Sequence, residues 1–455
     1  MACLPASRTT SRLGMFREVA AFTPEAFAKL GQHVRDEWIV EALSHARGHA
    51  HLRRRKLPVD RTLWLVIGMG LFRDRSIHEV AEHLRLTLPG ADGMDGIAGS
   101  ALPKARARLG AEPVEALFEL AGGHWAQAEG SGEAWRGLQL FGIDGVCLRV
   151  RDTRENDGAF GRPASGRGGS GYPQVRVVAL LALRSRVLMR MRVGAFSEGE
   201  QTLVGPLWAQ VPDHSMTLLD RGFLSWWPLW RLQGNGTERH WMVRARCDLR
   251  WRVVAPLGRG DARVEITVPR ALRRQHPEMP EVFQVRAVQR RVKGFRPFWL
   301  LTSALDPAAY PGAELSSLYH ERWELEVAAD EIKTHLLERE EALLRSKTPE
   351  GIRQELAGIG LAYNLVRVAM VRVAQELGLP PRRISFLHAL RDVRILCLSA
   401  WAASPGVVPR RVRDFEASLR LWVLPERRSG RRYPRHVKIK MSNYPRNRGR
   451  AGVLK

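Results

Sequence analysis

The sequence predicts a mixed α/β fold, with a sheet-forming centre between helical flanks. Up to about Gly132 the chain shows helical periodicity behind helix-start signals. From Leu138 it changes to β-rich segments that first form a meander and then alternate with helices, a pattern typical of a mixed sheet. Beyond Glu314 the periodicity is helical again. At 455 residues, the chain is long enough for two or three domains.

The N-terminal helices are predicted from start signals at residues 23–25, at Asp60 and at Ser76. A following segment, SALPKARARLG, forms a short basic helix. Two short helices, the second of them basic, favour a helix-turn-helix that reads DNA, but a solvated helix face explains the same charges equally well. The basic side chains of this helix are Lys104, Arg106 and Arg108.

The central strands include FGIDG and TLLDRG, each an apolar segment that carries one acid. Residues 240–295 contain further strands, broken by Gly258 and Gly260, and predict a β-rich insertion. PFWLLTSA, from Pro297, reads as another strand of the sheet. The stretch from Glu426 is basic and poor in apolar residues, and so predicts a tail that is flexible or contacts nucleic acid.

The charge of the chain is strongly positive. Lys and Arg number 72 against 47 Asp and Glu, a net charge of +25 that attracts polyanions such as nucleic acid. Arginine-rich codon usage over a solvated surface remains the alternative. A hydrophobic fraction of 45% indicates a globular protein.

Several classes of protein are excluded by missing motifs. There is no GxxxxGK[ST] loop, HExxH motif or Cys/His cluster, which argues against a P-loop ATPase and a zinc hydrolase. The N-terminus has no secretory h-region, and the longest apolar runs, such as WLVIGMGLF, are short for a membrane span. We therefore expect a cytoplasmic protein without a membrane partner. The four cysteines, Cys3, Cys147, Cys247 and Cys397, are widely spaced and predict no disulfide framework.

Asp144 and Asp220 stand out because they follow apolar residues in predicted strands. Burying a carboxylate is costly unless it is paired or bound to a metal ion. A single acid at a strand end is more often a turn former, so the pair is only suggestive.

A third acid lies on the predicted helix after Glu314. Tyr319, Arg322, Glu326 and Lys333 have the spacing Y-x2-R-x3-E-x6-K and share one narrow stripe at the edge of the apolar face of a regular α-helix. An ordinary i,i+4 ion pair between Arg322 and Glu326 is the alternative. The other acids of this helix point elsewhere, namely Glu324, Asp330 and Glu331.

These residue types suit phosphodiester chemistry. Three carboxylates can hold two divalent cations about 4 Å apart, Mg²⁺ or Mn²⁺, which activate a nucleophile and stabilise a leaving oxygen. Neighbouring Arg, Lys and Tyr side chains can grip the phosphates.

The spacing Y-x2-R-x3-E-x6-K resembles the YREK signature of bacterial DDE transposases of the insertion-sequence-four family. The resemblance extends to FGIDGVCLRVRDTRENDGAFGRP, to LLDRGF and to LLRSKTPEGIRQELAGIGLAYNLVR. An N-terminal stretch, FREV…FTPEAFAKL…WIVEAL, is similar to the DNA-binding region of that family. Together these segments span most of the chain.

The resemblance implies an RNase H-like catalytic core interrupted by a β-rich subdomain. It assigns Asp144, Asp220 and Glu326 as the metal-binding catalytic triad, and it places Tyr319, Arg322 and Lys333 on DNA. The expected segments are a helical N-terminal DNA-binding region (1–131), the first part of the core (132–239), the insertion (240–295), the second part with C-terminal helices (296–400) and a basic tail (401–455).

In related enzymes an aromatic residue stacks on a flipped base. Here Phe298 or Trp299 could serve, although the residue type favours a core aromatic for each.

The resemblance also implies an activity and its partners. We expect binding to double-stranded DNA at the terminal repeats of the element, metal-dependent strand cleavage, and strand transfer into target DNA by a homodimer assembled on DNA. Two alternatives are a nuclease of the same fold without strand transfer, and a catalytically silent DNA-binding regulator derived from a transposase.

Overall fold

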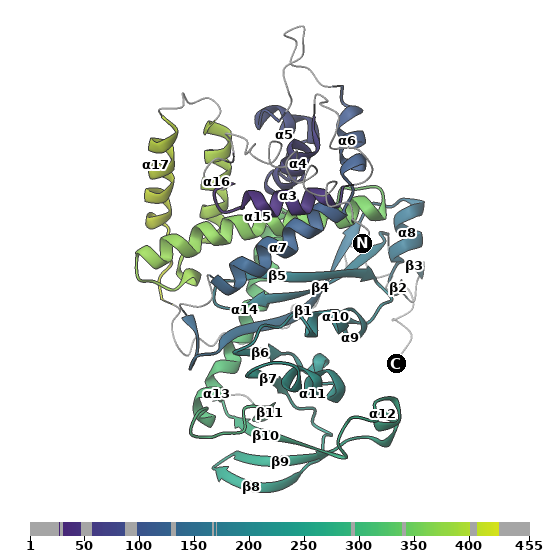
Figure 1. The fold of residues 1–455 in the computed structure, drawn as a ribbon, viewed down its shortest axis with the longest axis vertical. Helices are drawn as coiled ribbons and strands as arrows, with labels where there is room; N and C mark the ends of the chain where they lie inside the picture. Colours follow the sequence, from purple (N-terminus) through teal and green to yellow (C-terminus); the bar gives the residue numbers. More distant parts are fainter. Residues whose placement is uncertain are drawn as a thin grey trace, which may run out of the picture. The chain divides into compact units, whose positions relative to one another are not determined.

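In a computed structural model of the protein, one ten-stranded mixed sheet runs through the molecule (Figure 1). Residues 1–423 form one compact unit that contains every element named here, and residues 424–455 form a second unit. The structure describes residues 27, 31–46, 57–86, 98–128, 133–165, 168–169, 171–292, 296–338, 343–400 and 407–426.

The core of the sheet has the strand order β5-β4-β1-β6-β7. Its first three strands in the chain, β1, β4 and β5, pair antiparallel as a meander, whereas β6 is parallel to β1 and β7 is parallel to β6. This arrangement confirms the predicted mixed sheet of an RNase H-like core. The strands are β1 (Gln139–Val150), β4 (Gln174–Ala182), β5 (Val187–Ala195), β6 (Ser215–Leu219) and β7 (Arg239–Arg244).

The inserted strands continue this sheet instead of forming a separate β subdomain. β11 pairs antiparallel with β7, and β10, β9 and β8 follow outward. The predicted boundary at residue 240 falls inside β7, a strand that pairs in parallel with the core strand β6. The inserted elements are β8 (Arg252–Gly258), β9 (Asp261–Thr267), α12 (Arg270–Gln275), β10 (Val282–Arg290) and β11 (Phe298–Thr302).

The opposite edge of the sheet, β5, is covered by two helices, α7 (Glu112–Ala128) and α15 (Pro349–Glu376). Asn364 of α15 accepts a hydrogen bond from the N–H of Leu188 at 2.8 Å and donates one to its carbonyl at 2.7 Å. A side-chain amide therefore satisfies the edge backbone as a further strand would. α15 is long and apolar enough to cross a membrane, but 94% of its most apolar window is buried within the fold, as in a core helix.

The described residues of the N-terminal region are mostly helical, as predicted. Ser76 begins α5 with a capping box to Glu79, which confirms that start signal, and α4 begins beside Asp60. The signal at residues 23–25 lies outside the described residues. Residues 84–100 separate α5 from α6, which is too long a connection for a helix-turn-helix. These helices are α3 (Asp36–Ser44), α4 (Val59–Leu71), α5 (Ile77–His83) and α6 (Ala101–Leu109).

The region predicted as a tail contains a helix. α17 packs on α16 and buries Phe415 and Leu419, so the segment 401–455 is not a tail throughout. The remaining elements are α8 (Arg154–Phe160), β2 (Ala164–Ser165), β3 (Gly168–Gly169), α9 (Glu200–Leu203), α10 (Gly205–Trp208), η4 (Arg221–Phe223), α11 (Trp226–Gly234), α13 (Gly312–Leu318), β12 (Leu343–Leu344), η7 (Pro381–Arg383), α16 (Phe386–Ala400) and α17 (Val408–Leu421).

Candidate active site

The sheet brings the two aspartates together. Ile143 of β1 and Leu219 of β6 are partners in the parallel ladder, so Asp144 and Asp220 follow at the same level of neighbouring strands. Adjacent strands lie about 4.8 Å apart. Asp144 is half-buried and Asp220 is exposed where β6 ends. The spacing of nearly eighty residues between them is thus closed by strand pairing alone.

The helix that carries Glu326 changes its winding twice. A 3-10 turn, η5 (Tyr319–Arg322), leads into α14 (Trp323–Asp330), and a π-helical turn, η6 (Glu331–Leu336), follows. The prediction of a regular α-helix is therefore wrong in detail. The tighter 3-10 turn and the wider π turn shift the angular position of later residues in opposite directions, so the two deviations partly cancel.

A glycine in β1 lets this helix approach the sheet. A Cβ atom placed on Gly142 would lie 2.9 Å from the side chain of Leu325, so a larger residue would have to displace that side chain of α14. Gly142 and Asp144 face the same side of the sheet, because side chains alternate along a strand. Glu326, next to Leu325, is therefore carried over the face that presents Asp144.

Arg322 is the cation shared by the three acids. Its guanidinium donates a hydrogen bond to Glu326 at 3.0 Å and interacts electrostatically with Asp144 and Asp220. Burial raises the pKa of Asp144, and the nearby carboxylates of Glu200 and Asp220 act in the same direction. The Gly145 N–H and Arg322 oppose this rise.

The donor chemistry of the site fits a hard divalent cation. Asp144, Asp220 and Glu326 offer three carboxylates that each interact with Arg322, and the acids near Asp144 raise the cost of its negative charge, which a cation would offset. As placed, no three acidic, histidine or cysteine side chains of the described residues are grouped closely enough to hold an ion, and Glu326 is paired with Arg322. The residues thus supply suitable ligands, and Arg322 competes for one of them.

Tyr319 is buried beneath the site. Its hydroxyl donates a hydrogen bond to the carbonyl of Leu219, the residue before Asp220, at 2.9 Å. Burial raises the pKa of this hydroxyl to about 12. In this structure Tyr319 therefore anchors the helix to β6, a contact that the sequence alone did not predict.

A basic hollow adjoins Asp220. Arginines reach it from β7, from the inserted strand β10 and from η5, and aromatic rings line it beside them. Sequence reasoning missed Arg244 and Arg290 because only the strand order, with β7, β11 and β10 side by side, brings them here. The lining residues are Asp220, Arg244, Arg290, Phe298, Tyr319, His320, Arg322 and Trp323.

The two candidate stacking residues point to opposite faces of β11. Phe298 lines the hollow, with the Arg244 guanidinium 4.4 Å from its ring centroid. Trp299 packs instead against Trp251, with ring centroids 5.7 Å apart. Phe298 is therefore the one of the two that reaches the site.

The other candidate DNA contacts differ in their surroundings. Lys333 is half-buried and makes no hydrogen bond or ion pair with any residue that the structure describes. Lys104 is exposed and Arg108 half-buried, whereas Arg106 turns inward and donates to Gln354 at 2.8 Å and to Ser346 at 3.1 Å. The guanidinium of Arg106 therefore makes hydrogen bonds inside the protein. Neither a DNA-reading helix nor a solvated helix face describes this residue.

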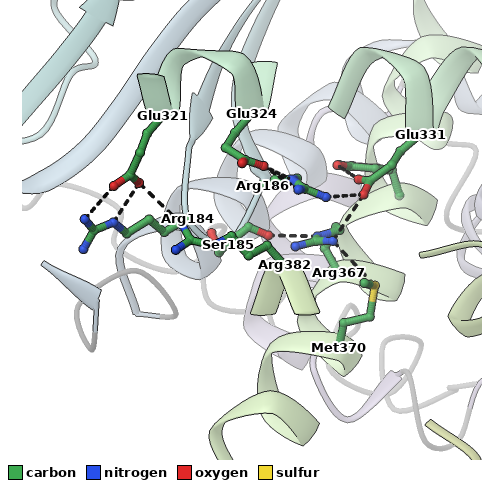
Figure 2. A network of polar contacts seen from close by, with 10 residues as sticks. Arg184, Ser185, Arg186, Glu321, Glu324, Glu331, Arg367, Met370 and Arg382 are labelled. Carbon is green, nitrogen blue, oxygen red and sulfur yellow. Dashed lines mark hydrogen bonds and ion pairs between the residues drawn. The ribbon is translucent and has the colours of Figure 1, made fainter. Parts of the chain in front are cut away.

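Two of the three acids predicted to point away from Glu326, namely Glu324 and Glu331, belong to a buried network (Figure 2), whereas Asp330 is exposed. Glu324 and Glu331 are both bound by Arg186, and Glu331 also accepts a hydrogen bond from the Tyr363 hydroxyl at 2.7 Å. No motif indicated this role, because Arg186 and Tyr363 lie far from the helix in the sequence.

Comparisons with known proteins agree along most of the chain. The model described as insertion element 4 transposase N-terminal matches residues 24–119, and the transposase DDE domain matches residues 135–365. Transposase InsG for insertion sequence element IS4, from Escherichia coli K12, is 36% identical over 419 residues, covering 91% of this chain and 93% of its own. Putative transposase InsZ from the same strain is 32% identical over 275 residues, covering 59% and 87%.

One solved structure also aligns, the piggyBac transposase synaptic complex with hairpin DNA. The alignment covers 91% of this chain and 88% of that one, at 12% identity and a TM-score of 0.43. A likeness at that level adds nothing to the family matches.

Proposed function

The chain belongs to the IS4 family of DDE transposases, enzymes that cleave DNA, and on that premise we propose that Asp144, Asp220 and Glu326 form its catalytic triad. One observation carries this proposal. Strand register sets the two aspartates side by side, and Arg322, which interacts with both, hydrogen-bonds the glutamate. Three acids from separate segments share one counterion only if they share one site.

The triad would hold divalent cations, Mg²⁺ or Mn²⁺, in a two-metal site. Bound cations supply an activated nucleophile and a stabilised leaving oxygen. Asp144 and Asp220 hold their carboxylates on the rigid sheet, and Glu326 completes the ligand set from the helix. In the absence of a metal ion, Arg322 balances the negative charge of the acids. When Glu326 binds a cation instead, the guanidinium of Arg322 is placed to pair with a phosphate oxygen of the DNA.

The reaction that we propose is cut-and-paste transposition. Water first breaks a phosphodiester at the end of the element and leaves a 3′-hydroxyl. That hydroxyl then attacks the phosphorus of a target phosphodiester. A new P–O bond joins element to target, the bond between that phosphorus and the target's own 3′ oxygen breaks, and this oxygen leaves as a 3′-hydroxyl on the flanking target nucleotide. Cutting of two ends requires two active sites, so a homodimer assembled on double-stranded DNA is expected to act in the bacterial cytoplasm.

The basic hollow gives this proposal its DNA contacts. Arg244 and Arg290 line it beside Asp220, and Phe298 presents an aromatic ring to the same space. Arginine pairs with phosphate oxygens and an aromatic ring stacks on bases. A DNA strand that enters the hollow would therefore be gripped next to the triad.

The test is cleavage of DNA that carries the flanking ends of the element, with Mg²⁺ present or absent, by the wild type and by Glu326→Ala. We expect metal-dependent nicking at the ends by the wild type and its loss in the variant. The matched control is Glu338→Ala, which removes an exposed acid of the same segment that pairs with Arg394. Equal cleavage by Glu326→Ala and wild type would overturn the assignment of the third acid.

The same assay separates the alternatives. Joined products with target DNA indicate a transposase, whereas nicks that are never joined indicate a nuclease. End binding by the wild type without any cleavage would indicate a silent regulator.

A further inference from the structure

Arginines bind three acids, Glu321, Glu324 and Glu331, of the helical segment that also carries Glu326 (Figure 2). Arg184 binds both carboxylate oxygens of Glu321, at 2.9 and 2.8 Å. Arg186 binds Glu324, and it reaches Glu331 at 2.6 Å. These contacts fall before, beside and after Glu326, so they hold the helix on both sides of the catalytic acid.

The gripped acids and the catalytic acid occupy opposite faces. At about 100° per residue, Glu331 lies within roughly 20° of Glu324, and Glu326 lies about 160° from it. Their environments agree, because Glu324 and Glu331 are buried while the side chain of Glu326 is 39% exposed beside Arg322. The arginines can therefore orient Glu326 without contacting substrate.

Both arginines lie in the turn between β4 and β5. Arg186 has φ +56°, a left-handed conformation that residues with a side chain rarely adopt, and its side chain is only 4% exposed. Such backbone geometry persists where the surroundings hold it. The turn is thus a fixed support for the helix.

This turn belongs to the strand next to Asp144. β4 pairs along β1, with Ala179 opposite Asp144, and the turn begins a few residues later. A continuous path of backbone pairing and ion pairs therefore runs from Asp144 to Glu326. A second support reaches Glu331 from α15, where Arg367 lies 3.5 Å away and also donates to the Ser185 carbonyl at 2.8 Å.

We propose that Arg184 and Arg186 are positioning residues that set the place of Glu326 relative to the two aspartates, and thereby the affinity of the site for divalent metal ions. This inference rests on the triad proposed above. Loss of residues that support metal ligands typically weakens metal binding about 10–100-fold. We expect a loss in that range for Arg186→Met, and a smaller loss for Arg184→Gln, whose side chain is 20% exposed.

Metal affinity is measured directly, without relying on catalysis. Mn²⁺ is titrated into the full-length protein, free Mn²⁺ is read by electron paramagnetic resonance, and the signal of Asp144→Asn serves as the blank. Two control variants each remove an ion pair that does not touch the helix. Arg73→Met breaks the buried pair with Glu355, and Arg353→Gln breaks the half-buried pair with Glu115. Both should lower thermal stability and leave Mn²⁺ affinity unchanged.

The outcomes separate positioning from general stability. Weaker Mn²⁺ binding in Arg186→Met and Arg184→Gln, with metal-free binding of end DNA unchanged and the controls normal, supports the proposal. If Arg186→Met fails to fold, Arg186→Lys and Arg184→Gln decide. Wild-type Mn²⁺ affinity in these folded variants overturns the positioning role. A wild type that binds Mn²⁺ but never cleaves end DNA defeats the proposed function and leaves this comparison intact.

Discussion

At the scale of the residue, Tyr319 can have one of two roles: it can contact DNA, or it can hold the helix of Glu326 against the sheet. The resemblance placed it on DNA, whereas its hydroxyl is bonded to the backbone of Leu219 in this structure. That bond joins the helix of Glu326 to the strand that ends at Asp220. We therefore expect Tyr319 to affect the site by fixing the distance between Asp220 and Glu326.

Tyr319→Phe tests that role. The variant loses one hydrogen bond and leaves a buried carbonyl without a partner, which costs about 1–3 kcal/mol of unfolding free energy near pH 7. The pKa of Tyr319 is about 12 in the folded protein against 10.0 unperturbed, so its contribution is complete below pH 10 and is lost as pH rises through 12. The difference in unfolding free energy between wild type and variant should therefore narrow between pH 10 and 12, measured by urea unfolding. Weaker binding of end DNA by a fully stable variant would favour a direct contact instead.

Much of the site could be predicted at this scale, and the reason for the remainder is physical. Asp144, Asp220 and Glu326 could be proposed from the sequence because an acid after an apolar strand, or in a motif, is visible in one dimension. The central place of Arg322 among the acids, and the arrival of Arg244 and Arg290, depend on which strands become neighbours. Local patterns carry no information on that.

At the scale of the element, close approach decides how the sheet is closed. α7 lies directly on the outer edge of β5, the last strand of the sheet. A Cβ atom on Gly122 would stand 2.7 Å from the Leu188 carbonyl oxygen. A helix can cover an edge strand this tightly only where it has no side chain. The sequence predicted the helix and the strand, but nothing in it indicated that they meet at this glycine.

Gly122→Ala is expected to destabilise the protein, because the helix must move off the strand edge, at a cost of about 1–3 kcal/mol. Gly158→Ala, in α8, is the matched control, since a Cβ atom there meets nothing within 4 Å. The control should be neutral or stabilising by up to about 1 kcal/mol, because alanine favours a helix over glycine. Urea unfolding of both variants measures the difference. Equal effects would mean that helix propensity, and not close packing, governs Gly122.

At the scale of the whole molecule, one buried glutamate joins the N-terminal helices to the catalytic core. Glu355 of α15 pairs with Arg73, which follows α4, at 2.6 Å, and it accepts hydrogen bonds from the backbone of Arg345 and from Ser346. Arg106 of α6 adds a further positive charge. Burial would raise the pKa of Glu355, but these partners hold it below its ordinary value.

Glu355→Gln should loosen this junction. The variant leaves the arginines without their counterion, which costs about 3–5 kcal/mol at neutral pH. Because the pKa of Glu355 is lower in the folded protein than its ordinary value of 4.5, its charge stabilises the fold fully above pH 4.5. This stabilisation is lost as the pH falls through the lower pKa of the folded protein. The difference in unfolding free energy between wild type and variant, measured by urea unfolding, should therefore shrink below pH 4.5. A gap that stayed constant from pH 7 to pH 3.5 would show that charge is not what Glu355 contributes.

The large-scale division of the chain was predictable only in part. The order helices, strands, helices followed from periodicity, and the extra strands after Asp220 were visible as β-rich segments. Their place in the same sheet was not predictable, because the outer side of a strand such as β7 offers the same backbone groups to a new partner whatever its side chains.

The way the inserted strands leave and return also affects how such a protein can change. The chain departs after β7 and comes back as β11, which pairs with β7 itself. The strands between them, β8 to β10, are therefore an insertion whose two ends lie on neighbouring strands, and among the described residues it joins the core sheet through the β7–β11 ladder alone. Hairpins could thus be added or removed at the far rim, two strands at a time, while the spacing of the acids stays the same. Lineages of such enzymes could in this way vary their reach along DNA without rebuilding their chemistry.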